Sequence, residues 1–153
     1  MIRALITGSF DPPTKGHLDI IKRSSEIFDE VVVCLCVNSE KKYMFEAEKR
    51  KAMLDAMCAD IENVSTDTTE GLVADYVKKN GIGVIVKGAR NGADFDYEST
   101  MAKVNKLLCS AETLILPAKA EYVHVSSSIA REMIRYSANV DEYLPKEVIK
   151  LIN

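Results

Sequence analysis

Several features whose presence would identify whole classes of protein are absent from this sequence. No apolar run approaches the ~20 residues that a membrane-spanning helix needs. The start, Met1-Ile2-Arg3-Ala4, enters a predicted strand directly, without the pattern of a signal peptide. The 153 residues carry a net charge of −3, which disfavours binding to duplex nucleic acid through bulk electrostatics. We therefore expect a cytoplasmic protein that binds neither a membrane nor nucleic acid.

Paired metal ligands are also missing. The four cysteines, Cys34, Cys36, Cys58 and Cys109, are scattered and do not combine with histidines at the spacing of a zinc site. Cys34 and Cys36 alternate within one predicted strand, so both side chains face the same side of it. We interpret them as small core residues, which suits a reducing cytoplasm. We predict no metal-ligating side chains.

Common motifs of nucleotide-dependent and hydrolytic enzymes are absent as well. There is no Gly-x-x-x-x-Gly-Lys-Ser/Thr loop and no Gly-x-Gly-x-x-Gly turn, so neither P-loop chemistry nor a dinucleotide-dependent oxidoreductase is supported. No serine lies in a nucleophile elbow, and no general base accompanies the candidate phosphate donors described below. The pattern suits a reaction catalysed by positioning of the substrates and stabilisation of charge.

Apolar runs alternate with helical patterns along the chain, which indicates βαβ units and a parallel sheet. The predicted strands are residues 3–7, 30–37, 64–66, 83–87 and 113–116, and the predicted helices are residues 17–28, 46–58, 71–79, 94–109, 126–136 and a last helix from Pro145. Hydrophobic residues make up 47% and charged residues 28%, the balance of a globular protein. Because there is no linker or repeat, residues 1–153 are predicted to form a single doubly wound, Rossmann-like α/β domain with a five-stranded parallel sheet flanked by helices.

Three segments rich in glycine, proline, serine or charged residues each follow a predicted strand. They are residues 8–17, 88–94 and 118–128. In sheets of this kind, ligands bind beyond the carboxyl ends of the strands. We therefore predict that the three segments meet at one edge of the sheet.

The first segment, Gly8-Ser9-Phe10-Asp11-Pro12-Pro13-Thr14-Lys15-Gly16-His17, has the composition of a phosphate-binding turn. Glycines let the backbone approach a ligand, and the start of a helix favours anions. Ser9 and His17 are the candidate hydrogen-bond donors. The helix dipole disfavours the imidazolium, so a neutral His17 is expected. The alternative is a turn in which His17 merely caps the helix.

The second segment brings two cations to a strand end. Lys87 and Arg90 surround Gly88 and form a local anion clamp on an acidic protein.

The helix predicted after this clamp carries further candidates. Asp94 is expected to be its N-cap, and Glu98 and Asn105 lie seven residues apart on one face. From spacing alone, a solvated helix side is the preferred interpretation of Glu98 and Asn105. The apolar stripe of the same helix is Tyr97, Met101, Val104 and Leu108.

The third segment ends in three consecutive serines at a predicted helix start. Ser126, Ser127 and Ser128 offer hydroxyls and free amides to phosphate oxygens. The alternative is an ordinary serine cap, although a run of three exceeds what capping requires.

A lysine pair follows the second predicted strand. Lys41 or Lys42 could reach a phosphate from a loop, and a solvated lysine pair is about equally compatible with the spacing.

Two of these segments resemble the signatures of the nucleotidyltransferase superfamily. Residues 8–17 resemble its T/H-x-G-H signature, and Val125-Ser126-Ser127-Ser128-Ile129-Ala130-Arg131 resembles its I-S-S-T/S-x-x-R signature. Residues 39–45 and 88–98 narrow the resemblance further. From Arg3 to the last helix, the chain is similar to the bacterial phosphopantetheine adenylyltransferases.

This resemblance implies a reaction and a set of site residues. The phosphate of 4′-phosphopantetheine attacks the α-phosphorus of ATP in line, without a covalent intermediate, and gives dephospho-coenzyme A and pyrophosphate with the help of Mg²⁺. The implied catalytic residues are His17, as transition-state stabiliser, Lys41 and Arg90. The implied ATP contacts are Ser9, Phe10, His17, Gly88, Ala89, Arg90, Glu98, Tyr122, Val123, His124, Val125, Ser126, Ser127 and Ser128. The implied phosphopantetheine contacts are Ser9, Lys41, Val73, Lys87 and Asn105.

The chain departs from the family pattern at three positions. Lys87 stands where the family usually has arginine, which keeps the charge and loses the bidentate fork. Ser9 replaces the commoner threonine and keeps the hydroxyl, and Tyr122 replaces a frequent tryptophan and preserves an aromatic wall. The resemblance also implies a homohexamer and feedback inhibition by coenzyme A.

Two other functions are compatible with parts of the sequence. One is a sister nucleotidyltransferase acting on nicotinate mononucleotide or glycerol phosphate, against which the Lys41 loop and residues 90–98 argue. The other is a non-catalytic nucleotide-binding module, against which the presence of both His17 and the serine run argues.

Overall fold

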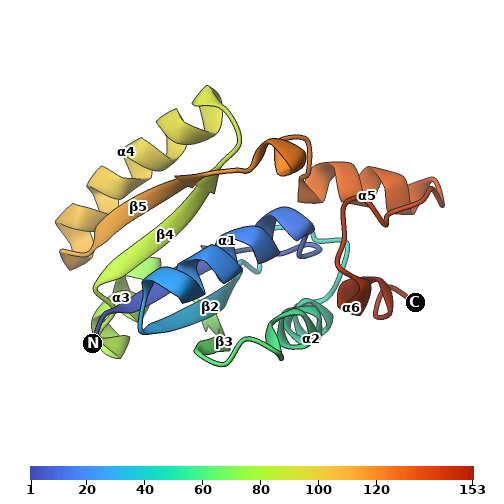
Figure 1. Cartoon of the computed structure of the whole chain (residues 1–153). Coiled ribbons are helices and arrows are strands. Elements are labelled where there is room, and N and C mark those ends of the chain that lie inside the picture. The colour runs from blue at the N-terminus through green and yellow to red at the C-terminus, as the bar shows by residue number, and fades with distance from the viewer.

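A computed structural model describes residues 1–153 and shows an α/β fold built on one parallel sheet (Figure 1). The strands are β1 (Arg3–Gly8), β2 (Glu30–Val37), β3 (Val64–Glu70), β4 (Val84–Ala89) and β5 (Glu112–Pro117). Their order across the sheet is β3-β2-β1-β4-β5, and every neighbouring pair is parallel. The predicted fold class, a doubly wound five-stranded parallel sheet with flanking helices, is confirmed.

Helices cover both faces of this sheet, and each face has its own hydrophobic cluster. The helices are α1 (Lys15–Ile27), α2 (Ala47–Cys58), α3 (Val73–Asn80), α4 (Gly92–Cys109), α5 (Ser127–Arg135) and α6 (Lys146–Ile149), with a short 3-10 helix, η1 (Ala120–Tyr122), before α5. The larger cluster takes buried residues from α1, α2, α5 and α6, and the smaller one is formed with α3 and the end of α4. Because both faces are covered, the inner strands read as nearly continuous apolar runs.

The edge strand β3 is longer than its apolar residues suggest. The sequence predicted residues 64–66, and the strand runs from Val64 to Glu70. Its extension contains Asp67 and Thr68, which are exposed, because an edge strand need not be apolar on both faces.

Two helix starts differ from the predicted ones. Helix α1 begins at Lys15 with Thr14 as its N-cap, two residues before the expected start. Helix α4 begins at Gly92, and its N-cap is Asn91, whose side chain accepts a hydrogen bond from the Asp94 amide at 2.9 Å. The prediction of Asp94 as the N-cap is therefore wrong.

The outer side of α4 exposes apolar side chains. The predicted stripe is only partly covered in the isolated chain, since Tyr97, Val104 and Leu108 are exposed and Asn105 is the buried residue of this helix. Helix α4 also does not meet the requirements of a membrane span, nor does any other helix of the structure.

Candidate active site

A pocket of about 340 Å³ lies at the carboxyl ends of β1 and β4. It is lined by parts of all three segments that the sequence singled out, so the prediction that they meet at one edge of the sheet is confirmed. Of the predicted site residues, the pocket brings together His17, Lys87, Gly88, Ala89, Arg90, Glu98, Tyr122, Val125, Ser126, Ser127 and Ser128.

The ring of His17 is oriented by the start of α1. The side-chain oxygen of Thr14 accepts a hydrogen bond from the His17 amide at 3.3 Å, and Nδ1 of His17 accepts one from the Thr14 amide at 3.0 Å. This reciprocal pair is a capping box with histidine in the place of the usual glutamate or glutamine. Because Nδ1 is an acceptor, the proton of the neutral ring is on Nε2. The capping interpretation and the donor interpretation of His17 are thus compatible.

His17 is neutral for a reason that the sequence only partly indicated. Burial of the ring, followed by the positive charges of Arg90 and Lys87, lowers the pKa of His17 from 6.5 to about 4. The sequence-based argument relied on the helix dipole, whereas desolvation is the largest cause here. The rings of His17 and Phe10 also pack against each other at a steep angle of 69°, with their centroids 4.9 Å apart. A neutral, fixed Nε2–H can donate a hydrogen bond to a phosphate oxygen.

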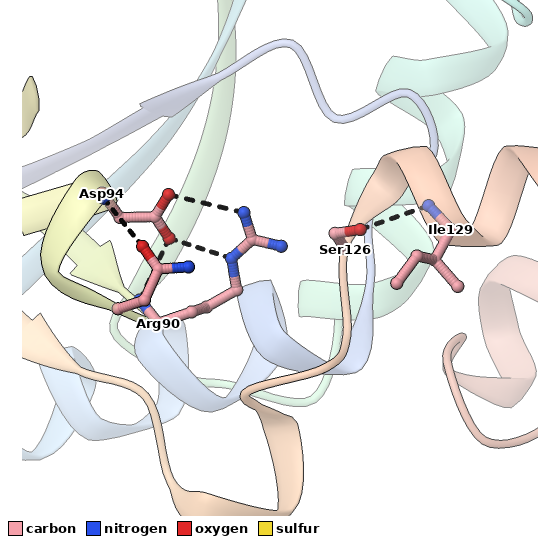
Figure 2. A network of polar contacts seen from close by, with 5 residues as sticks. Arg90, Asp94, Ser126 and Ile129 are labelled. Carbon is pink, nitrogen blue, oxygen red and sulfur yellow. Dashed lines mark hydrogen bonds and ion pairs between the residues drawn. The ribbon is translucent and has the colours of Figure 1, made fainter.

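Arg90 is held in place by a carboxylate at the start of α4. Its backbone amide and its Nε donate hydrogen bonds to Oδ2 of Asp94 at 3.1 and 2.9 Å. The guanidinium in turn lowers the pKa of Asp94. Figure 2 shows this pair on one side and Ser126, at the start of α5, on the other. Asp94 therefore fixes the cation that was predicted to bind phosphate.

Lys87 extends from β4 toward the neighbouring strand. Its Nζ donates a hydrogen bond to Oγ1 of Thr7 at 2.8 Å, and both residues line the pocket. The same Nζ also donates to the carbonyl of Thr7 at 3.4 Å, which leaves its third proton available for an anion.

Gly88 is required by helix packing at the pocket floor. A Cβ atom at this position would lie 3.1 Å from Cγ1 of Ile20 on α1. The absence of a side chain lets α1, which carries His17, pack closely on β4.

Each of the three serines makes a contact within the protein. Ser126 is the N-cap of α5 and accepts a hydrogen bond from the Ile129 amide at 3.2 Å (Figure 2). The hydroxyl of Ser127 donates to the carbonyl of Pro12 at 2.8 Å, and the hydroxyl of Ser128 accepts from Arg131 at 3.3 Å. The run is therefore more than a cap, since its second member joins α5 to the first segment.

Seven predicted site residues do not line the pocket: Ser9, Phe10, Lys41, Val73, Asn105, Val123 and His124. Ser9 and Lys41 are exposed at the surface, and the Phe10 side chain is buried in the larger hydrophobic cluster. Asn105 lies thirteen residues after the start of α4, which corresponds to about 20 Å along a helix. These seven assignments stay predictions.

The remaining three of these residues have other surroundings. Val73 is the first residue of α3 and packs against the smaller cluster. Val123 is exposed, and Nε2 of His124 lies 2.8 Å from a carboxylate oxygen of Glu142. In this structure the His124 ring is thus engaged with the C-terminal segment.

Several residues of the pocket were not predicted as site residues. Thr7, Thr14 and Asp94 contribute polar groups, and Ile6 and Ile20 contribute apolar surface. Thr14 is the one with a local signal, because a threonine three residues before His17 fits an N-cap pattern.

The carboxylates of the lining are few. Only Asp94 and Glu98 line the pocket, and no group of three or more histidine, cysteine or acidic side chains is arranged to hold a metal ion. Because Asp94 is engaged with Arg90, Glu98 is the carboxylate that remains available. A Mg²⁺ ion that takes most of its oxygen ligands from water and from a bound triphosphate fits such a lining.

Comparisons with known proteins show which family the chain resembles and which fold it shares. A model of the cytidylyltransferase-like family matches residues 5–133. A phosphopantetheine adenylyltransferase from Pseudarthrobacter chlorophenolicus is 42% identical over 98% of the chain and 91% of that protein, and one from Clostridium novyi is 43% identical over 96% and 92%. The crystal structure of a putative nicotinate-nucleotide adenylyltransferase from Vibrio parahaemolyticus superposes with a TM-score of 0.75 at 19% identity, over 99% of this chain and 92% of that one, which shows the shared fold.

Proposed function

The chain belongs to the cytidylyltransferase-like family and, within it, to the phosphopantetheine adenylyltransferases, and we propose that it transfers the adenylyl group of ATP to 4′-phosphopantetheine. The products are dephospho-coenzyme A and pyrophosphate. Both enzymes named above, which match nearly the full chain, support this choice of acceptor.

The observation that carries the proposal is the neutral Nε2–H of His17 beside two cations. An oxygen of the acceptor phosphate forms a bond to the α-phosphorus of ATP, and the bond from that phosphorus to the bridging oxygen of the β-phosphate breaks. Pyrophosphate leaves with the electron pair. His17 donates to an α-phosphate oxygen as charge accumulates there, and its pKa of about 4 keeps the ring in the required neutral form.

The cationic side chains of the site are proposed to bind different substrates. Arg90, held by Asp94, binds the triphosphate of ATP, and Lys87 binds the acceptor phosphate together with Lys41 and Ser9. Lys41 itself is exposed, in the loop between β2 and α2.

The other contacts follow the same division. Gly88, Ala89, Glu98 and the segment from Tyr122 to Ser128, with Phe10, are proposed to bind ATP, and Val73 and Asn105 to bind the pantetheine arm. Mg²⁺ would be held by the triphosphate and by water, and it would neutralise phosphate charge.

Features beyond the reaction are also proposed. Residues 1–153 form one nucleotidyltransferase domain, as the single sheet supports. The exposed apolar side chains Val104, Leu107, Leu108 and Leu114 support assembly, for which we propose a homohexamer. We further propose a cytoplasmic location, which the four free cysteines support, and feedback inhibition by coenzyme A.

Pyrophosphate release tests this function directly. The protein is incubated with ATP, Mg²⁺ and, in separate reactions, 4′-phosphopantetheine, nicotinate mononucleotide or glycerol phosphate, and dephospho-coenzyme A is identified by mass spectrometry. We expect release with 4′-phosphopantetheine. Preferred turnover of another acceptor, or no turnover with any of them, would contradict the proposal.

A further inference from the structure

Arg50 is a buried cation without an anionic partner. This residue of α2 is 1% exposed, and none of the ion pairs of the chain includes it. Its Nε donates a hydrogen bond to the carbonyl of Phe45 at 3.0 Å, and its Nη1 donates one to the carbonyl of Ser9 at 2.7 Å. Burial of a guanidinium is costly unless its protons are hydrogen-bonded. The carbonyls of Phe45 and Ser9 are therefore the groups that Arg50 is positioned to bind.

The two carbonyls belong to different functional segments. Ser9 lies in the turn that leads to His17, and Phe45 lies at the end of the loop 38–46, which carries Lys41. The ring of Tyr43, from the same loop, packs on the guanidinium with its centroid 3.9 Å from Cζ. Arg50 therefore connects the loop to the turn.

Asp11 makes the complementary connection from the side of the turn. Its carboxylate, in a residue that is 5% exposed, accepts hydrogen bonds from the amides of Met44 at 2.8 Å and Phe45 at 2.9 Å. The amide of Phe45 is thus bonded to Asp11 and its carbonyl to Arg50. This end of the loop is fixed to the turn, four residues from Lys41.

We propose that Arg50 is a positioning residue for the acceptor phosphate, which sets the loop of Lys41 at a fixed distance from Ser9. The proposal rests on the proposed function, in which Lys41 and Ser9 bind the same phosphate. Lysine cannot replace Arg50 in this role, because one ammonium lacks the rigid fork that donates to two separated carbonyls.

Steady-state kinetics of Arg50→Lys, Lys41→Ala and the double variant distinguish a positioning role of Arg50 from a general contribution to the stability of the fold. In R50K we expect KM for 4′-phosphopantetheine to rise about tenfold or more, and KM for ATP to change less than about twofold. In the K41A background, the same substitution should add little, because both act through one contact. Arg3→Lys is the control for loss of a guanidinium elsewhere, since Arg3 also donates to a carbonyl, that of Asn80 at 2.9 Å, and pairs with Glu30 at the other end of β1.

Several kinetic outcomes would overturn the proposal. One is an equal rise of KM for 4′-phosphopantetheine and KM for ATP in R50K. Another is a double variant in which the fold-changes in KM of R50K and K41A multiply. A third is a change of KM in R3K as large as that in R50K.

Hydrogen exchange gives a second readout that does not need activity. In R50K, amides of residues 9–11 and 39–45 should exchange faster together, and R3K should leave them unchanged. If R50K does not fold, Asp11→Asn, which loses one acceptor, should produce the same joint loosening. Unchanged exchange in the folded variants refutes the connection. Joint loosening in a protein without adenylyl transfer would instead refute only the proposed function.

Discussion

Replacement of Arg90 by methionine removes one of the causes that hold the pKa of His17 low. In the wild type that pKa is about 4, so roughly one ring in a thousand is charged at pH 7. In Arg90→Met we expect the pKa to rise, yet to stay below 6.5, because burial is the largest cause and Lys87 remains. The proton should stay on Nε2 in both proteins, since Nδ1 accepts from Thr14.

The same shift predicts how stability depends on pH. Between a folded pKa of about 4 and an unfolded value of 6.5, the unfolded chain binds more protons at this group. The free energy of unfolding therefore gains from His17 as the pH rises through this interval, by about 3 kcal/mol in all, and the gain is complete above 6.5. His17→Gln is the matched reference, because glutamine at this position preserves the capping box without titrating.

Two measurements check these expectations. NMR titration of the imidazole nitrogens reports the pKa and the tautomer, and the exposed His124 is the only other histidine in the spectrum. Urea unfolding of the wild type and H17Q at several pH values reports the difference in stability, from which other groups cancel. The reasoning fails if His17 titrates near 6.5, if the proton is on Nδ1, or if the stability difference does not vary with pH.

Three further substitutions test other parts of the site. His17→Ala should lower kcat about 100- to 1000-fold, because the transition-state donor is removed, and an unchanged kcat in a steady-state assay would exclude the donor role. Lys87→Arg should lower KM for 4′-phosphopantetheine and leave KM for ATP unchanged, since a bidentate fork replaces a single ammonium; a higher acceptor KM would argue against contact with the phosphate. Gly88→Ala should destabilise the fold by about 1–3 kcal/mol in urea unfolding, because its Cβ meets Ile20 at 3.1 Å. Adding Ile20→Val should restore part of that loss, and Gly92→Ala, with open space at its Cβ, should cost nothing.

Local patterns were sufficient to predict most of the fold. The inner strands are apolar on both faces, and the sequence predicts them at nearly their full length. The predicted range of β3 is too short because the second half of this strand is polar. The start of α1 was missed because histidine is an unusual partner in a capping box. On α4, periodicity indicated a buried stripe, but it does not reveal which side of a helix a neighbour covers, and Val104 and Leu108 are exposed.

The candidate site was predictable where its residues follow strand ends. Topology alone brings the three segments together, which accounts for His17, Arg90 and the serine run in one pocket. Contacts between distant segments were not predictable in this way. The hydrogen bonds of Arg50 to Ser9 and of Asp11 to Phe45 join residues more than thirty positions apart in the sequence, and no local pattern predicts them.

The two hydrophobic clusters lie on opposite faces of the sheet and share no residue. The pocket is where both layers are within reach of one molecule, because α1 and α5 supply His17 and Ser127 from one side and α4 supplies Glu98 from the other. We therefore expect a nucleotide bound in this pocket to contact both layers at this edge of the sheet. The nucleotide-bound protein is accordingly expected to be the stiffer state, and the two layers are expected to move more independently once the product has left.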